Sequence, residues 1–320
     1  MTEFPRPPDD LLLRVLAKMG GGADEEDYLV FDRSGHQSAQ ELEVFAASVG
    51  RTLGSFTRVL DFGCGPGRVT RWLEPRTSTW ELHGCDIDRQ AIEWDQEHLP
   101  FATFEHTGAE PPLPYSDGYF DLVINHSVFT HLDERYQDMW LEELRRVVMP
   151  GGLLILSIHG EFAFQIAERE MRAGGEDSVS WRRSLEHHGI LFVADDAYLG
   201  GVFPDFYHTT FHSPWYVFSH WSRWFDVKSY LPKADLGRQD VVVLQRRADD
   251  EETPLPLQPA IDRESSSPLQ LLARRAVERL LRRLASKEPA DQAPQRIPHV
   301  VHVILEEHGR RLRALEERTK

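Results

Sequence analysis

Residues 59–73, with the sequence VLDFGCGPGRVTRWL, constrain most strongly what this chain can fold into. The segment begins as a short apolar run, passes through glycines at 63, 65 and 67, and resumes with apolar residues at helical spacing. This pattern predicts a buried strand, a tight turn and a helix start. Glycine permits positive φ, and N–H groups at a helix start favour negative charge. Because the Asp61 carboxylate ahead of the turn can receive an ammonium group, the segment predicts a site for an amino-acid-like ligand.

A second apolar segment strengthens that prediction. Residues 80–85 are typical of a strand, and they lead to Asp86, nineteen residues after Gly67. An open α/β sheet places an acidic side chain there, against ribose hydroxyls, and a dinucleotide fold does the same, so NAD is the rival ligand. The dinucleotide fingerprint is Gly-x-Gly-x-x-Gly. The spacing here is Gly-x-Gly-x-Gly with Asp61 two positions ahead, which favours S-adenosylmethionine.

Four segments resemble the class I S-adenosylmethionine-dependent methyltransferases, and they occur in that family's order within about residues 28–247: DFGCGPG at 61–67, CDID at 85–88, FDLVI at 120–124 and LRRVVMPGG at 144–152. The resemblance implies an α/β fold of the Rossmann-like type, a doubly wound, seven-stranded, mostly parallel sheet with helices on both faces. It also implies S-adenosyl-L-methionine as cofactor and methyl transfer as the reaction. A weaker resemblance, carried by YHTTFHS at 207–213 and WSRWF at 221–225, is to bacterial methyltransferases that modify cell-surface glycans and related metabolites.

Changes in composition divide the chain into parts. We expect an N-terminal helical lid at 1–54 and the methyltransferase domain at 55–248, with an aromatic-rich cap insertion at about 160–222. Residues 249–267 are charged, Pro-rich and then Ser-rich, as in a linker, and residues 268–320 predict a C-terminal helical tail. Isolated amphipathic helices of this length cannot bury their apolar faces, so the tail should self-associate, pack on the body, or dock on a partner or an anionic membrane surface.

The apolar periodicity predicts the individual elements. Helices are expected at about 11–16, 38–53 and 134–148, after residue 67, and through Ile92 and Phe164. Strands are expected from residue 59 and at 80–85, 103–106, 120–124, 153–159, 225–231 and 240–245. The last two should form an antiparallel hairpin, because they alternate in polarity and are joined by a short connection.

The candidate cofactor contacts follow the predicted strand ends. Gly108 and Ala109 are expected to reach adenine through backbone groups, although the Asp-Ala pair usual in the family is missing there. Tyr28 is a candidate contact from the lid, with simple packing in the core as the alternative. The expected contacts are Asp61, Gly63, Cys64, Gly65, Gly67, Asp86, Ile87, Gly108, Ala109, Asn125 and Tyr28.

Methylation of a hydroxyl requires a base that removes its proton, and histidine suits neutral pH. Of the 15 histidines, position favours His126 after the fourth strand, His159 after the fifth, and His208 and His212 within the aromatic cap. His126 and His212 rank first. His131 is interpreted as a helix-start residue. The two cysteines, Cys64 and Cys85, are too few for a disulfide scaffold, and no metal site is expected.

The net charge of −16 is unevenly distributed, because residues 251–320 hold 13 basic against 11 acidic residues and residues 1–250 hold 23 against 41, a net charge of −18. An acidic body repels phosphate backbones and disfavours a nucleic-acid substrate. The chain shows no signal peptide and no apolar run of about 18 residues, which predicts a cytoplasmic protein without a transmembrane segment. The two resemblances imply methylation of an oxygen on a carbohydrate or small metabolite. The alternative is a cofactor-binding but catalytically inactive subunit of an assembly.

Overall fold

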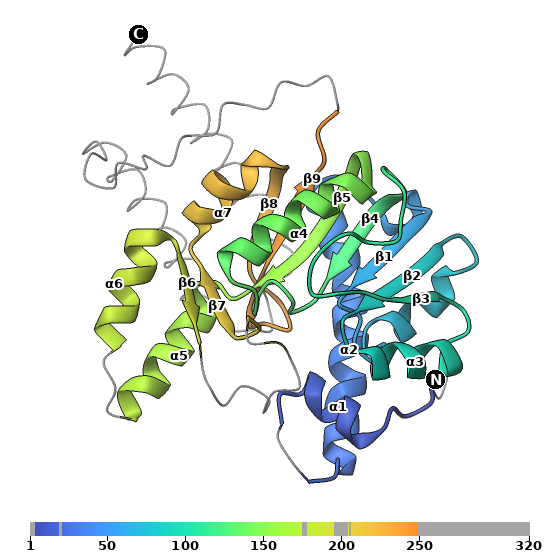
Figure 1. Ribbon diagram of the computed structural model, residues 1–320, viewed down its shortest axis with the longest axis horizontal. Coiled ribbons are helices and arrows are strands. Elements are labelled where there is room, and N and C mark those ends of the chain that lie inside the picture. Colours follow the sequence, from blue (N-terminus) through green and yellow to red (C-terminus); the bar gives the residue numbers. More distant parts are fainter. Residues whose placement is uncertain (1–3, 19–20, 175–177, 195–203, 205, 249–320) are drawn as a thin grey trace.

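The computed structural model describes residues 4–18, 21–174, 178–194, 204 and 206–248. Its centre is a seven-stranded sheet in the order β3-β2-β1-β4-β5-β9-β8 (Figure 1). Six strands run in one direction, and β9 alone runs in the opposite direction between β5 and β8. The predicted doubly wound, mostly parallel sheet and its closing hairpin are thus confirmed. The strands are β1 (Arg58–Phe62), β2 (Glu81–Asp86), β3 (Thr103–His106), β4 (Phe120–Asn125), β5 (Val148–Ile158), β8 (Asp226–Asp235) and β9 (Gln239–Gln245).

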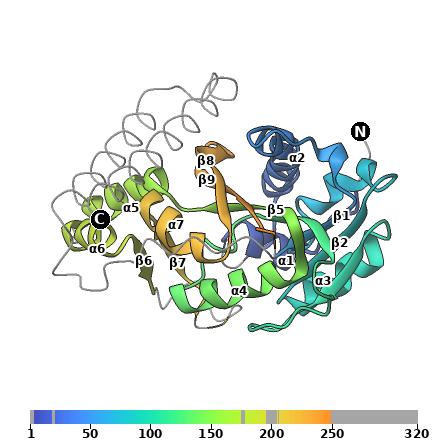
Figure 2. The ribbon, with the colours of Figure 1, turned by 90° about the horizontal axis from the view of Figure 1, so that it is seen from above.

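Helices cover both faces of this sheet. Figure 2 shows α2 on one side and α4 with α7 on the other. A smaller sheet of β6 (Ile190–Val193) and β7 (Thr209–His212) lies beside α5 and α6 (Figure 1). The helices are α1 (Asp9–Val15), α2 (Glu25–Ala47), α3 (Arg89–His98), α4 (Glu134–Val147), α5 (Glu161–Ala173), α6 (Ser178–His188) and α7 (Pro214–His220), with short 3₁₀ segments η1 (Leu53–Ser55), η2 (Thr70–Arg76) and η4 (Trp221–Arg223).

Neighbouring residues of the central strands enter different layers of the core. Leu60 of β1 belongs to the apolar cluster that includes Trp140 of α4. Its neighbour Val59 belongs to the cluster that includes Leu42 and Phe45 of α2. Since both faces of the sheet are covered, the middle of β1 and of β4 is apolar and buried, as in other parallel strands.

Two predicted helices differ from the structure. The helix expected at about 38–53 begins at Glu25 and ends at Ala47. Asp24 and Asp27 form a capping box in which each carboxylate accepts from the other residue's backbone N–H, so the acidic run starts the helix. The helix expected after the glycine turn is the 3₁₀ segment η2, which contains Pro75. Proline lacks the N–H that an α-helix interior needs.

The carboxyl ends of β1, β2, β4 and β5 meet at one edge of the sheet, where ligands of open α/β folds bind. The ends of α1 and α5 lie at the same edge (Figure 1). The expected linker at 249–267 and tail at 268–320 lie outside the described residues, as does part of the cap. Within the described residues, no helix has both the length and the apolar character needed to cross a membrane.

Candidate active site

The turn after β1 depends on glycine at several positions. Gly63, Gly65 and Gly67 have φ of +79°, +53° and +63°, in the left-handed region that other residues avoid. A Cβ placed on Gly63 would lie 2.1 Å from Cγ2 of Val128. The turn therefore bends tightly against the segment that follows β4, and this brings residues 63–68 to the same place as residues 126–128.

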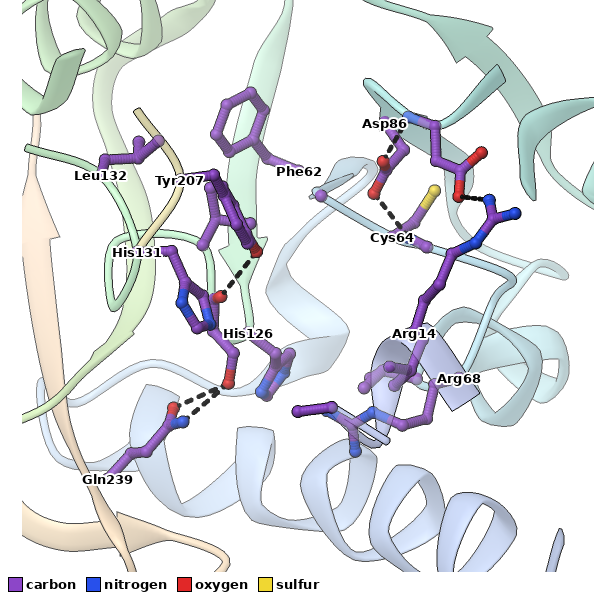
Figure 3. Close-up of a pocket in the computed structure, with 18 of the residues that line it drawn as sticks. Arg14, Phe62, Cys64, Arg68, Asp86, His126, His131, Leu132, Tyr207 and Gln239 are labelled. Atoms are coloured by element: carbon purple, nitrogen blue, oxygen red, sulfur yellow. Dashed lines mark hydrogen bonds and ion pairs between the residues drawn. The ribbon is translucent and has the colours of Figure 1, made fainter. Parts of the chain in front are cut away.

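A cavity of about 730 Å³ lies next to this turn. One end is lined by the turn, by Asp86 and Ile87 after β2, and by residues 107–109. The other end is lined by residues of the β4 and β5 ends and of the β8–β9 hairpin, among them His126 and Gln239 (Figure 3). The cavity therefore contacts residues at the ends of four strands, β1, β2, β4 and β5.

Two carboxylates line the first end, that of the buried Asp61 and that of the half-buried Asp86. Asp86 accepts from the backbone N–H groups of Gly65 and Asp88, both at 2.8 Å, and burial raises the pKa of Asp86 to about 6. Asp61 accepts from Oγ1 of Thr70 at 2.5 Å, and burial raises the pKa of its carboxyl also. Both groups can accept further hydrogen bonds, because each carboxylate has about four lone-pair directions.

The N–H groups of the glycine turn are already used within the protein. Gly63 and Cys64 donate to the carbonyl of Cys85 at 2.8 and 3.1 Å. Gly65 donates to Asp86. The N–H groups of Gly63, Cys64 and Gly65 are therefore not free for a ligand, and the negative charge at the N–H of Gly65 is that of the Asp86 side chain.

The second end of the cavity contains a paired histidine. Nδ1 of His126 lies 3.4 Å from Oδ2 of Asp235, whose Oδ1 accepts from Oγ of Ser38 at 3.0 Å. An ionised carboxylate only accepts, so Nδ1 carries the proton in this contact. Nε2 of His126 is buried and has no hydrogen-bond partner within the described part of the chain. Burial acts to raise the pKa of Asp235, but His126 and Arg68 outweigh it and hold the pKa of that carboxyl below its usual value.

The backbone beside His126 is held in an uncommon conformation. Ser127 has φ of +61°, which is rare for a residue with a Cβ. Its N–H donates to Oγ of Ser157 at 2.8 Å, and its own Oγ is bonded to the side-chain amide of Gln239 (Figure 3). Such local strain persists where surrounding contacts fix it, often at functional sites, and here it sets the direction of the preceding His126.

Two further histidines line the cavity in a neutral state. Nδ1 of His131 lies 2.6 Å from the carbonyl oxygen of His208, and its ring stacks on Tyr207 with centroids 4.5 Å apart. Burial lowers the pKa of His131 to about 3 and that of His159 to about 4. These imidazoles are uncharged across the physiological range, so they provide a polar but neutral wall.

Comparison with known proteins identifies the domain. A family described as "Methyltransferase domain" matches residues 60–156, which contain the glycine turn, Asp86 and His126. Residues 60–156 of this chain form a class I S-adenosylmethionine-dependent methyltransferase domain. Methyltransferase GfsG of Streptomyces halstedii is 28% identical over 141 residues, covering 41% of this chain and 48% of that protein. A trans-aconitate 2-methyltransferase of Streptomyces coelicolor is 28% identical over 174 residues, covering 48% of this chain and 54% of the relative.

The methyltransferase chain thus spans about half the length of these curated relatives. Among solved structures, the N-methyltransferase NodS from Bradyrhizobium japonicum, in complex with S-adenosyl-L-homocysteine, is similar with a TM-score of 0.42 and 14% identity. That similarity covers 71% of this chain and 94% of the other.

The residues of the methyltransferase site fit the family's cofactor, S-adenosylmethionine. A Cβ on Gly65 would lie 3.5 Å from Cγ2 of Val15 on α1. Both residues line the cavity, so a side chain at position 65 would occupy space between the turn and α1. Asp86 is placed to accept from ribose hydroxyls and Asp61 from an ammonium group. The cavity also offers backbone groups at residues 107–109 to a base.

Most of the predicted site residues of the methyltransferase come together. Those that line the cavity are Asp61, Gly63, Cys64, Gly65, Asp86, Ile87, Gly108, Ala109, His126 and His159. Five others are not among its lining residues: Tyr28, Gly67, Asn125, His208 and His212.

Each of these five has a different place in the structure. The Tyr28 hydroxyl donates to Asp9 at 2.8 Å, and Nδ2 of Asn125 donates to the carbonyl of Phe62 at 2.5 Å. A Cβ on Gly67 would lie 2.4 Å from Leu99, so this glycine serves close packing.

The two cap histidines that were candidate bases do not face the cavity. His212 is fully buried, and its Nε2 lies 3.0 Å from Oε1 of Gln137. Burial lowers the pKa of His212 to about 3. The carbonyl of His208 accepts from His131, and its ring lies edge-on to Phe192 with centroids 5.6 Å apart.

Three cavity residues were missed by sequence reasoning. His131 was interpreted as a helix-start residue, yet it lines the cavity. Asp235 lies at the end of β8, 109 residues from His126, and no local pattern marks the pair. Arg68 directly follows the glycine turn, a position that could have indicated it.

Proposed function

We propose that this chain transfers the methyl group of S-adenosylmethionine to a hydroxyl oxygen of a carbohydrate or another small metabolite, with His126 as the general base. The observation that carries the proposal is the placement of the His126 ring. Nε2 is buried in the cavity wall and is unpartnered within the described residues, while Nδ1 is engaged by Asp235. A ring held by a carboxylate at one nitrogen, with no hydrogen-bond partner at the other, leaves that second nitrogen to take a proton, as a general base does.

The chain's own residues then supply position and proton transfer. When bound, the cofactor provides an electrophilic methyl group and a neutral leaving group. With the methyl group going to the acceptor oxygen and a neutral thioether leaving, His126 would take the hydroxyl proton at Nε2. The imidazolium lies beside the Asp235 carboxylate, whose charge stabilises it.

The other cavity histidines are poorer candidates for this role. A base works best when its pKa is near the operating pH. Burial lowers the pKa of His131 to about 3 and that of His159 to about 4, so both bind protons weakly at neutral pH. They support the proposal as neutral hydrogen-bonding groups that surround an acceptor.

The aromatic side chains of the cavity support an acceptor with a ring. Tyr207, Phe206 and Phe211 line the end that contains His159. Aromatic faces present large, apolar and rigid area to a ligand. A sugar ring or a phenol fits such a wall and also carries the hydroxyl on which His126 acts.

The full chain should be incubated with methyl-tritiated S-adenosylmethionine and a panel of monosaccharides, glycosides, phenols, amines and thiols. We expect transfer to a hydroxyl compound, and His126→Gln should lower kcat about 10²–10⁴-fold while cofactor affinity stays within about twofold. His188→Gln is the matched control, because His188 is exposed on α6 and lies outside the cavity lining.

Several results would overturn the proposal. One is transfer only to amines or thiols, and another is an unchanged rate in His126→Gln. Binding of the cofactor without transfer to any member of the panel would favour the inactive-subunit alternative.

A further inference from the structure

The carboxylate of the bound cofactor needs a partner that the glycine turn does not provide. The N–H groups of Gly63 and Cys64 donate to Cys85, and that of Gly65 donates to Asp86. The methionine part of S-adenosylmethionine nevertheless carries a full negative charge. Burying a carboxylate without a hydrogen-bonding or charged partner is strongly unfavourable, so another group must receive it.

Arg68 is the group that meets this requirement. It follows the turn directly, is half-buried and lines the cavity. Within residues 4–248 as far as they are described, its guanidinium makes one hydrogen bond, from Nη1 to Oγ of Ser34 at 3.3 Å, and it has no ion pair within 4.0 Å. A guanidinium has five N–H donors, so most of its hydrogen-bonding capacity remains for a ligand.

The position of Arg68 also matches the geometry of an amino acid. The ammonium and the carboxylate are attached to one carbon, so their receptors must lie close to each other. Asp61 is the buried carboxylate placed for the ammonium, and the positive charge of Arg68 acts on it, as it does on Asp235. Figure 3 shows the Arg68 side chain extending along the cavity toward His126.

The backbone of Arg68 is fixed by close packing. A Cβ placed on Gly35 of α2 would lie only 2.0 Å from the Arg68 carbonyl oxygen, so helix and turn touch through their backbones. Ser34, the hydrogen-bond partner of the guanidinium, precedes this glycine on the same helix. The side chain therefore starts from a rigid point, which reduces the entropy cost of ordering it on a ligand.

We infer that Arg68 is the receptor for the α-carboxylate of S-adenosylmethionine, paired with Asp61 as the receptor for the α-ammonium. The chain then recognises the amino-acid end of its cofactor with two side chains of opposite charge. An arginine suits a carboxylate because its planar fork can donate two parallel hydrogen bonds.

The inference is tested by binding alone, with two ligands that differ by one group. Calorimetry of the full chain should compare S-adenosylmethionine with decarboxylated S-adenosylmethionine, which lacks only the carboxylate. We expect wild type to bind the decarboxylated compound about 10–100-fold more weakly. Arg68→Met should weaken binding of S-adenosylmethionine by a similar factor and leave the decarboxylated compound within about threefold. Arg68→Lys should recover part of the preference.

Two controls separate recognition from structure. Arg145→Met changes an exposed arginine of α4 that is not among the lining residues of the cavity, and it should leave both affinities unchanged. Thermal unfolding of the variants without ligand should show that they remain folded. Equal binding of the two compounds by wild type, or an equal loss for both in Arg68→Met, would overturn the assignment. Neither result would bear on the role of His126.

Discussion

Arg14 of α1 donates from Nη1 to Oδ2 of Asp88, the residue that caps α3, over a distance of 2.5 Å and a separation of 74 residues (Figure 3). Its other nitrogen donates to Gln90 at 2.7 Å and to Asp10 at 2.9 Å. These contacts hold α1 across the cavity end that contains the glycine turn, and Val15 of the same helix lines it. The N-terminal helix is thus tied to the start of α3, beside the end of the cavity that contains the glycine turn.

Loss of this tie should speed cofactor release. We expect Arg14→Met to raise the dissociation rate of S-adenosylmethionine about 3–10-fold, because a partly buried charge-assisted contact that holds the helix closed is removed. Stopped-flow displacement of the cofactor measures the rate. Arg6→Met is the control, since its ion pair with Glu25 is exposed at both residues. An equal change in both variants would show that the Arg14 contact has no special role.

Cofactor affinity should depend on pH through Asp86. Burial raises the pKa of Asp86 to about 6, so the carboxyl becomes protonated as pH falls below that value and accepts ribose hydroxyls less well. The affinity for S-adenosylmethionine should therefore decrease between about pH 7 and pH 5, and Asp86→Ala should weaken binding about 10–150-fold at pH 7.5. Calorimetry across this range measures both effects. Asp240→Asn, which alters another buried carboxyl outside the cavity lining, should keep the wild-type profile.

Asp240 should make the free energy of unfolding decrease as pH rises. Burial raises its pKa to about 6, above the value of about 3.9 in an unfolded chain. The folded state therefore holds the proton more strongly, and ionisation of this group lowers the free energy of unfolding as pH rises from about 4 to 6. Relative to wild type, Asp240→Asn should gain stability over that interval and stay level above it. Urea unfolding at several pH values would reveal the opposite slope if the carboxyl were stabilised in its charged form.

Two glycines with the same backbone conformation should differ in their tolerance of alanine. Gly63 and Gly151 both have φ of +79°. A Cβ on Gly63 would collide with Val128 at 2.1 Å, whereas a Cβ on Gly151 meets nothing within 4 Å. We expect Gly151→Ala to cost about 1–2 kcal/mol for the left-handed backbone, and Gly63→Ala about 2–5 kcal/mol because overpacking is added. Equal urea midpoints would contradict the steric part of this account.

The tail should be separable from the methyltransferase body. The seven-stranded sheet is complete at Gln245, before the expected linker. A chain ending at Ala248 should bind S-adenosylmethionine within about twofold of the full chain and lose any self-association, because the two predicted tail helices would carry it. Light scattering and calorimetry of both chains test this. An insoluble shortened chain would show that the tail packs on the body.

The sequence by itself determined the layers of this protein and the cofactor end of the site. Apolar runs and alternation reflect neighbours in the chain, so the strands, the β8–β9 hairpin and the glycine turn could be predicted from local pattern. Asp86 was found in the same way, because its distance from the turn is set by one strand–helix–strand unit. The start of α2 was missed, although the capping residue Asp24 stood in the sequence as a signal.

Only the tertiary structure decided which polar groups face the cavity. His126 and His212 were equal candidates in sequence, but one meets Asp235 from a distant strand and the other turns toward Gln137 in the core. Likewise, the turn has N–H groups in any sequence of this type, and it is the packing of β2 that occupies them and leaves the anion to Arg68. Such choices depend on contacts between residues far apart in the chain, and on the burial that shifts each pKa, which local periodicity does not encode.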